Sequence, residues 1–218
     1  MSMALIRSAY QDELDGVSQS LVDLTNMVTA SIVKASKAVQ AADLGLAEEV
    51  IAADSRIDDF QHELDARIID IIARQQPVAS DLRALVTAMR MSADLERMGD
   101  LSHHIAKVAR LRHPERAIPD SCLLIFTEMG HVAEKLSIMV AGVITTRDTE
   151  MALQVERDDD EMDDLHSKAI STIVDPSHGL SVETAIDLTL LGRYYERYAD
   201  HAVSVARRVY FLVTGTFA

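Results

Sequence analysis

The segment DLERMGD, at residues 94–100, returns one hundred residues later as YYERYAD, at residues 194–200. Each copy contains a Glu-Arg pair and an Asp four residues after the Glu. Residues four apart lie on one face of an α-helix, so each copy places two carboxylates side by side. The recurrence indicates that one structural unit is used twice.

A second recurrence precedes each of these segments. Asp54 and Asp58 return as Asp159 and Asp163, at an offset of 105 residues. The five-residue difference between the two offsets falls in the turns that separate the acidic pairs. We therefore predict an internal duplication that spans both halves of the chain.

The composition is that of an all-α protein. Hydrophobic residues make up 48% of the 218 residues, but aromatic residues only 4%, and Gly and Pro are scarce, which disfavours β folds. Breakers and caps predict six helices, over about residues 4–42, 43–75, 81–111, 122–146, 148–175 and 181–213. Because Pro114 and Pro119 separate two triplets, we predict two tandem three-helix bundles of long antiparallel helices, with domains at residues 1–113 and 114–218.

The charge excludes several classes of function. Asp and Glu outnumber Lys and Arg by 35 to 21, so the net charge is −14, which argues against nucleic-acid binding and against direct docking to an anionic membrane. No run reaches the roughly 18 apolar residues of a membrane span, and the acidic N-terminus does not resemble a secretory signal. Cys122 is the single cysteine, as in a reducing compartment. We expect a cytoplasmic protein.

The acidic pairs of the first half are predicted to face one another. If the chain folds back at Pro77, Asp54 lies level with Asp100 and Asp58 lies level with Glu96, because each pair is equidistant from residue 77. Four carboxylates that converge between two helices repel one another unless a positive charge compensates them.

The second half repeats this arrangement. Asp159 is paired with Asp200, and Asp163 with Glu196, about a midpoint beside Gly179. A nearby arginine does not supply the compensating charge, because Arg197 is adjacent to Glu196 and so lies about 100° round the helix. Arg97 stands in the same relation to the first cluster.

A bound cation is the better candidate, since all-oxygen ligand sets suit Mg, Ca, Mn or iron. The predicted metal ligands are Asp54, Asp58, Glu96, Asp100, Asp159, Asp163, Glu196 and Asp200. His62 and His104 can add imidazole ligands to the first site, whereas the second has Ser204 in place of His104. The alternative is that these carboxylates form an acidic surface that is exposed to solvent and binds no metal.

No catalytic motif is evident. The chain has no glycine-rich phosphate loop and no Ser/His/Asp arrangement, so we expect no enzyme activity. A carboxylate-bridged di-metal enzyme on a helical bundle is the alternative, but it needs two Glu-x-x-His motifs, and only Glu128 and His131 fit. A helical adaptor without metal is a third hypothesis.

Three segments resemble the signature segments of the PhoU family, the regulators associated with the bacterial high-affinity phosphate transporter. They are QQPVASDLR at residues 75–83, DLERMGD at 94–100 and YERYADHA at 195–202. The resemblance extends over essentially the whole chain, including the duplication. The second copy departs from the commoner Glu-Arg-x-Gly-Asp form, with Tyr198 and Ala199, and these larger side chains are expected to alter the cluster there.

The resemblance implies two three-helix bundles and multinuclear metal clusters, of iron or zinc, at the acidic motifs. It also implies negative regulation of high-affinity phosphate transport and of the phosphate-starvation response, without catalysis. The implied partners are the ATP-binding subunit of the phosphate ABC transporter and the sensor histidine kinase of the phosphate two-component system. A homodimer is expected as well, without nucleic-acid binding or membrane insertion.

Overall fold

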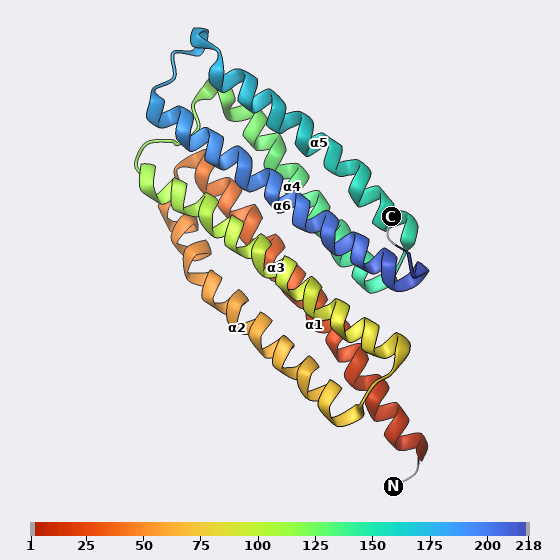
Figure 1. The fold of residues 1–218 in the computed structure, drawn as a ribbon. Coiled ribbons are helices and arrows are strands. Elements are labelled where there is room, and N and C mark those ends of the chain that lie inside the picture. Colours follow the sequence, from red (N-terminus) through yellow and green to blue (C-terminus); the bar gives the residue numbers. More distant parts are fainter. Residues whose placement is uncertain (1–2, 217–218) are drawn as a thin grey trace.

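The computed structural model describes residues 3–216, with side chains from residue 10 onward, and consists of helices and short connections (Figure 1). The helices are α1 (Met3–Ala41), α2 (Leu44–Gln75), α3 (Ala79–Arg112), α4 (Asp120–Thr146), α5 (Thr149–Val174) and α6 (Val182–Thr214), with a 3₁₀ turn, η1 (Pro176–His178), between the last two. No strand occurs between residues 3 and 216. The all-α prediction and the six helices are confirmed.

Local sequence explains where the helices begin. The Asp43 carboxylate accepts a hydrogen bond from the backbone N–H of Leu46 at 3.0 Å and caps α2, as predicted. Asp148 caps α5 in the same way, and the Ser181 hydroxyl accepts from the N–H of Thr184 at 3.0 Å to cap α6. These side chains satisfy backbone donors that the first helical turn leaves without partners.

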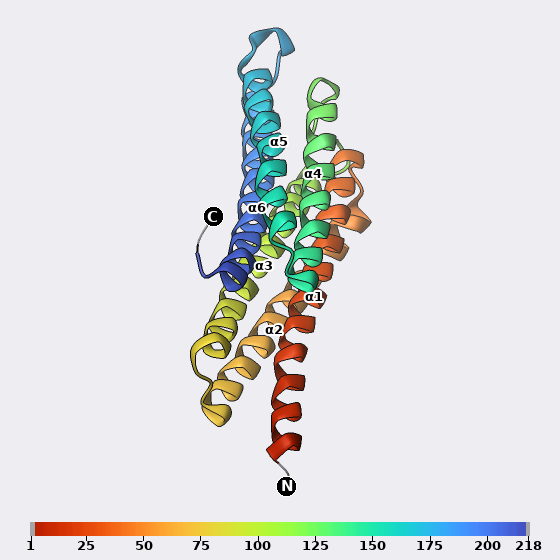
Figure 2. The same cartoon turned by 90° about the vertical axis from the view of Figure 1, so that its right-hand side faces the viewer.

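The six helices form two packed triplets. Helices α1, α2 and α3 pack together, as do α4, α5 and α6, and the triplets meet where α1 lies against α4 and α3 against α6. The α2–α3 and α5–α6 hairpins point to opposite ends of the elongated molecule (Figure 2). One hydrophobic core runs through both triplets, so the division into domains at residue 114 stays a prediction.

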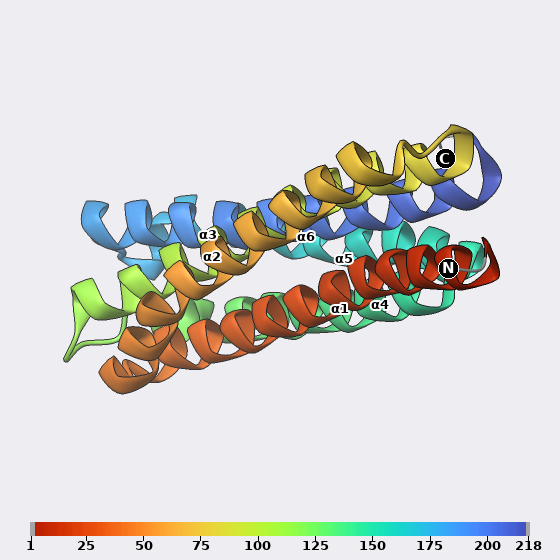
Figure 3. The same cartoon turned by 90° about the horizontal axis from the view of Figure 1, so that it is seen from below.

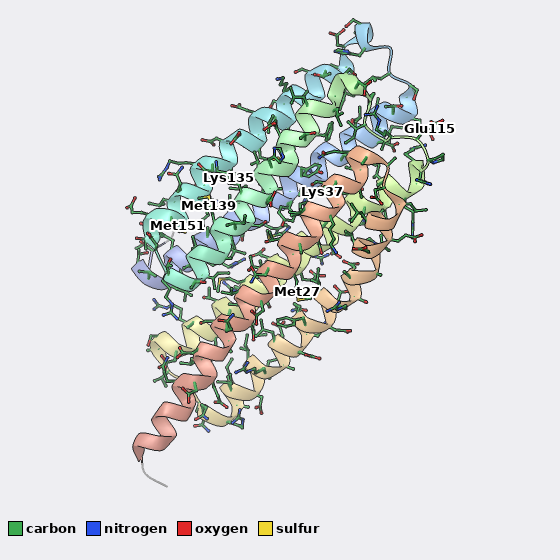
Figure 4. All side chains as sticks on the ribbon, turned by 180° about the vertical axis from the view of Figure 1, so that it is seen from behind. Met27, Lys37, Glu115, Lys135, Met139 and Met151 are labelled. Atoms are coloured by element: carbon green, nitrogen blue, oxygen red, sulfur yellow. The ribbon has the colours of Figure 1, made fainter. Side chains whose placement is uncertain are left out.

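Helices α1 and α4 form one layer, and α3 and α6 lie in the other (Figure 3). Figure 4 shows the face made by α1 and α4, with Met27 and Lys37 on α1 and Lys135 and Met139 on α4. The outer helices α2 and α5 pack against the other helices of their own triplets, and each carries two of the predicted metal ligands. Within the described residues, no helix has both the length and the apolar character needed to cross a membrane.

A polar cluster joins the two triplets across α3 and α6. The Asp94 carboxylate accepts hydrogen bonds from His201 Nδ1 at 3.0 Å, Ser204 Oγ at 3.0 Å and Arg208 Nε at 2.8 Å. Burial alone would raise the pKa of Asp94, but the hydrogen bonds from these three side chains outweigh burial and hold the pKa below its usual value. Asp94 therefore connects helices of different triplets as a half-buried anion that accepts three hydrogen bonds.

We expect Asp94→Ala to lower the free energy of unfolding by about 3 kcal/mol, because it leaves the Arg208 guanidinium partly buried without its anion. Denaturant unfolding measures this loss, and Asp164→Ala, at an exposed position on α5, serves as the control with a change below about 0.5 kcal/mol. Equal midpoints for the two variants would show that the cluster does not hold the triplets together.

Candidate metal centre

The α2–α3 hairpin brings three of the predicted ligands into one cluster. Asp54 and Asp58, on α2, and Asp100, on α3, each place a carboxylate oxygen within 4.8 Å of the other two. All three residues are half-buried. Among the described residues, this is the one group of three or more potential ligands that gathers so closely.

A glycine allows the two helices to approach at this level. A Cβ atom at Gly99 would lie 3.0 Å from Cγ2 of the buried Ile57, closer than side chains normally pack. Ile57 directly precedes Asp58, and Gly99 directly precedes Asp100. The glycine of the Glu-Arg-Met-Gly-Asp segment therefore sets the spacing of α2 and α3 between the facing acidic pairs.

His103, which the sequence analysis did not single out, contacts one residue of the cluster. Nδ1 of His103 pairs with Oδ2 of Asp54. The other polar atoms of the two side chains, His103 Nε2 and Asp54 Oδ1, are buried and have no hydrogen-bond partner in the described part of the chain. Buried polar atoms without partners are costly, and a cation beside Asp54 would give its Oδ1 atom a partner.

Glu96 lies beside this cluster rather than inside it. Burial raises the pKa of the Glu96 carboxyl, and the charges of Asp100, Asp58 and Asp54 raise it further, while Arg97 opposes them. Burial and then the Asp54 and Asp100 charges likewise raise the pKa of Asp58. The cluster thus has an excess of negative charge that its protein neighbours do not neutralise.

The two histidines considered from the sequence lie outside the close group of three carboxylates. His62 is near enough to Asp58 to lower the pKa of that carboxyl. His104 turns toward the second triplet, where its ring stacks on Tyr194 of α6 with centroids 5.2 Å apart. Burial, with the charges of Lys107 and His103, lowers the pKa of His104.

The second hairpin holds its four predicted ligands more loosely. Asp159 has its pKa raised to about 7, first by burial and then by the charges of Asp163, Asp200, Asp160 and Glu196. The Glu196 carboxylate accepts hydrogen bonds from the Arg193 guanidinium. The four predicted ligands of the second hairpin therefore interact electrostatically. They do not form a close group like that on α2 and α3.

The donors of the first site fit a metal ion. Carboxylate oxygens with a neighbouring imidazole suit iron, zinc or manganese, and an ion held by Asp54, Asp58 and Asp100 would give the partnerless Oδ1 of Asp54 a partner. Such an ion would supply positive charge between the two helices and offset the repulsion of their carboxylates. The second site offers oxygen donors alone.

These features define a duplicated, all-helical protein with a close carboxylate cluster on the α2–α3 hairpin and a looser set of carboxylates on the α5–α6 hairpin. The PhoU domain model matches residues 21–109 and 126–209, one segment in each triplet. The chain belongs to the PhoU family.

The similarity extends to named relatives. A Mycobacterium bovis protein, "Phosphate-specific transport system accessory protein PhoU homolog 2", is 42% identical over 212 residues, covering 97% of this chain and 100% of that protein. "Homolog 1" of the same organism is 36% identical, covering 96% of this chain and 95% of that protein.

Solved structures show the same fold. The crystal structure of PhoU from Pseudomonas aeruginosa has a TM-score of 0.85 and 27% identity, and it covers 95% of this chain and 100% of that one. That of the phosphate transport system regulatory protein PhoU from Streptococcus pneumoniae has a TM-score of 0.86 and 23% identity, with 96% and 99% covered.

We expect the combined variant Asp54→Asn, Asp58→Asn, Glu96→Gln and Asp100→Asn to lose the metal bound by the first hairpin and to keep that of the second, because each hairpin has its own ligands. Elemental analysis of protein purified without chelator measures the loss. Full metal content in the variant would show that these four residues are not the ligands.

In metal-free buffer we expect Asp159→Asn to raise the melting temperature more at pH 8 than at pH 5. The pKa of Asp159 is raised from 3.8 to about 7 in the folded protein, so ionisation of this carboxyl destabilises the fold. The stability of the wild type is therefore unaffected by this group below pH 4 and is partly lost as the pH rises through 7. The amide of Asp159→Asn cannot ionise, so the variant avoids this loss. Melting curves with chelator measure the shifts, with Asp164→Asn as the control. A shift independent of pH would contradict the electrostatic account.

Proposed function

We propose that this protein is a negative regulator of high-affinity phosphate transport and of the phosphate-starvation response. The observation that carries the proposal is membership of the PhoU family over both triplets, together with relatives named as phosphate-specific transport system accessory proteins. The regulator would act through protein contacts, on a helical scaffold that metal at the acidic clusters holds in shape.

The proposed partners are the ATP-binding subunit of the phosphate ABC transporter and the sensor histidine kinase of the phosphate two-component system. With a net charge of −14, the chain has little attraction for an anionic membrane surface, so its effect on a membrane transporter would come through proteins. Metal at the clusters would neutralise carboxylates that otherwise repel an acidic partner.

The proposal includes a cytoplasmic location, a homodimer and no catalysis. The buried, unpaired thiol of Cys122 accords with a reducing compartment. The di-metal enzyme is the less favoured alternative, because the side chains of Glu128 and His131 lie on an exposed face of α4. A bundle enzyme would direct these side chains into the bundle interior.

Deletion of the gene is expected to derepress phosphate uptake and phosphate-starvation genes at high phosphate. Wild-type protein should restore repression, and the first-site quadruple variant should restore it poorly if metal supports the scaffold, while Asp164→Asn serves as the matched control. Reporter expression and phosphate uptake are the measurements. Because Mycobacterium bovis has two relatives of this chain, any second copy is deleted in the same strain.

Normal repression in the strain without any copy would contradict the proposed function. If the quadruple variant has lost its metal and still restores repression fully, the proposed regulatory function stands. The proposed role of the first metal site in that function is then contradicted.

A further inference from the structure

A pocket of about 580 Å³ lies between α3 and α6, at the junction of the two triplets. Arg97 from α3 and Arg193 and Arg197 from α6 line it, together with His104 and His201. Asp100 is the one carboxylate among its lining residues. Three guanidinium groups around one pocket are notable in a chain with a net charge of −14.

The duplication explains why the pocket is basic. Arg97 and Arg197 occupy equivalent positions in the two copies of the repeat, and the packing of α3 against α6 brings both to one pocket. Guanidinium groups have planar sets of donors that match the oxygens of a phosphate group, whose tetrahedral shape accepts donors from opposite sides. The stacked rings of His104 and Tyr194 form part of the wall.

Two of the three arginines are paired with predicted metal ligands. Nη1 of Arg97 lies 2.7 Å from Asp100, and its Nε lies 3.6 Å from Glu96. Arg193 donates to Glu196. In the described part of the chain, the side chain of Arg197 has no hydrogen bond or ion pair, so its guanidinium is free to meet a ligand.

Metal binding would change the balance of charge around the pocket. A cation held by Asp100 and Glu96, or by Glu196, would compete with Arg97 and Arg193 for the same carboxylate oxygens. The arginine donors would then turn to another anion, and the repulsion from those carboxylates would decrease.

We propose that this pocket binds a phosphate-class oxyanion when the neighbouring carboxylates hold metal. This inference rests on the proposed function, because it identifies the signal that the regulator reads. The ligand is either free inorganic phosphate or the phosphoryl group of a nucleotide, since both present the same oxygens to the arginines.

The test is calorimetric titration of inorganic phosphate, and separately of ADP, into the metal-loaded full-length protein. We expect saturable binding that Arg197→Gln weakens about tenfold or more, because a charge-assisted hydrogen bond is lost. Arg110→Gln, which removes an exposed arginine of α3 outside the pocket, should bind as the wild type does. Binding of phosphate alone identifies free phosphate as the ligand, and binding of ADP alone identifies a nucleotide.

If neither phosphate nor ADP binds to the metal-loaded protein, the inference is overturned. Equal affinity in the wild type and Arg197→Gln would also overturn it and would place the anion on the metal itself. Equal affinity after chelation would contradict the link to metal. Metal content is measured in every sample, so protein that takes up no metal would instead contradict the metal site of the proposed function.

Discussion

The mutual repulsion of carboxylates between α2 and α3 is the constraint on which the structure depends. The hairpin places Asp54, Asp58 and Asp100 within 4.8 Å of one another, with Glu96 beside them. Hydrophobic packing along the hairpin holds these charges together despite their repulsion. A cation at this cluster is our proposal, because the folding of the helices alone does not require aligned, half-buried acids.

The duplication gives the molecule a second level of organisation. Packing of α3 against α6 joins the triplets, and there one copy of the repeat contacts the other. The copies have diverged at this junction, since Asp94 in one corresponds to Tyr194 in the other. Asp94 binds three donors of α6, whereas Tyr194 stacks on His104. The interface is consequently asymmetric, and the arginine pocket lies between the two acidic hairpins.

Much of the fold was predictable from the sequence, because caps such as Asp43 and Asp148 act locally and the repeat aligns the acidic pairs. Three of the four predicted ligands of the first site lie close together, as the fold-back at Pro77 predicted, and Glu96 lies beside them. The role of His103 depends on the rotation of α3 against α2, which no local pattern fixes. Its spacing of seven residues after Glu96 places it on the acidic face and was the available signal. The arginine pocket depends on the packing of the triplets.

The most direct test of the central claim is an anomalous-difference map from crystals of protein purified with its metal, recorded at the absorption edge of the element that elemental analysis finds. The account predicts a peak at roughly 2.0–2.3 Å from oxygens of Asp54, Asp58 and Asp100, near His103. An ordered cluster without an anomalous peak, in which protein side chains or water satisfy the carboxylates, would contradict it.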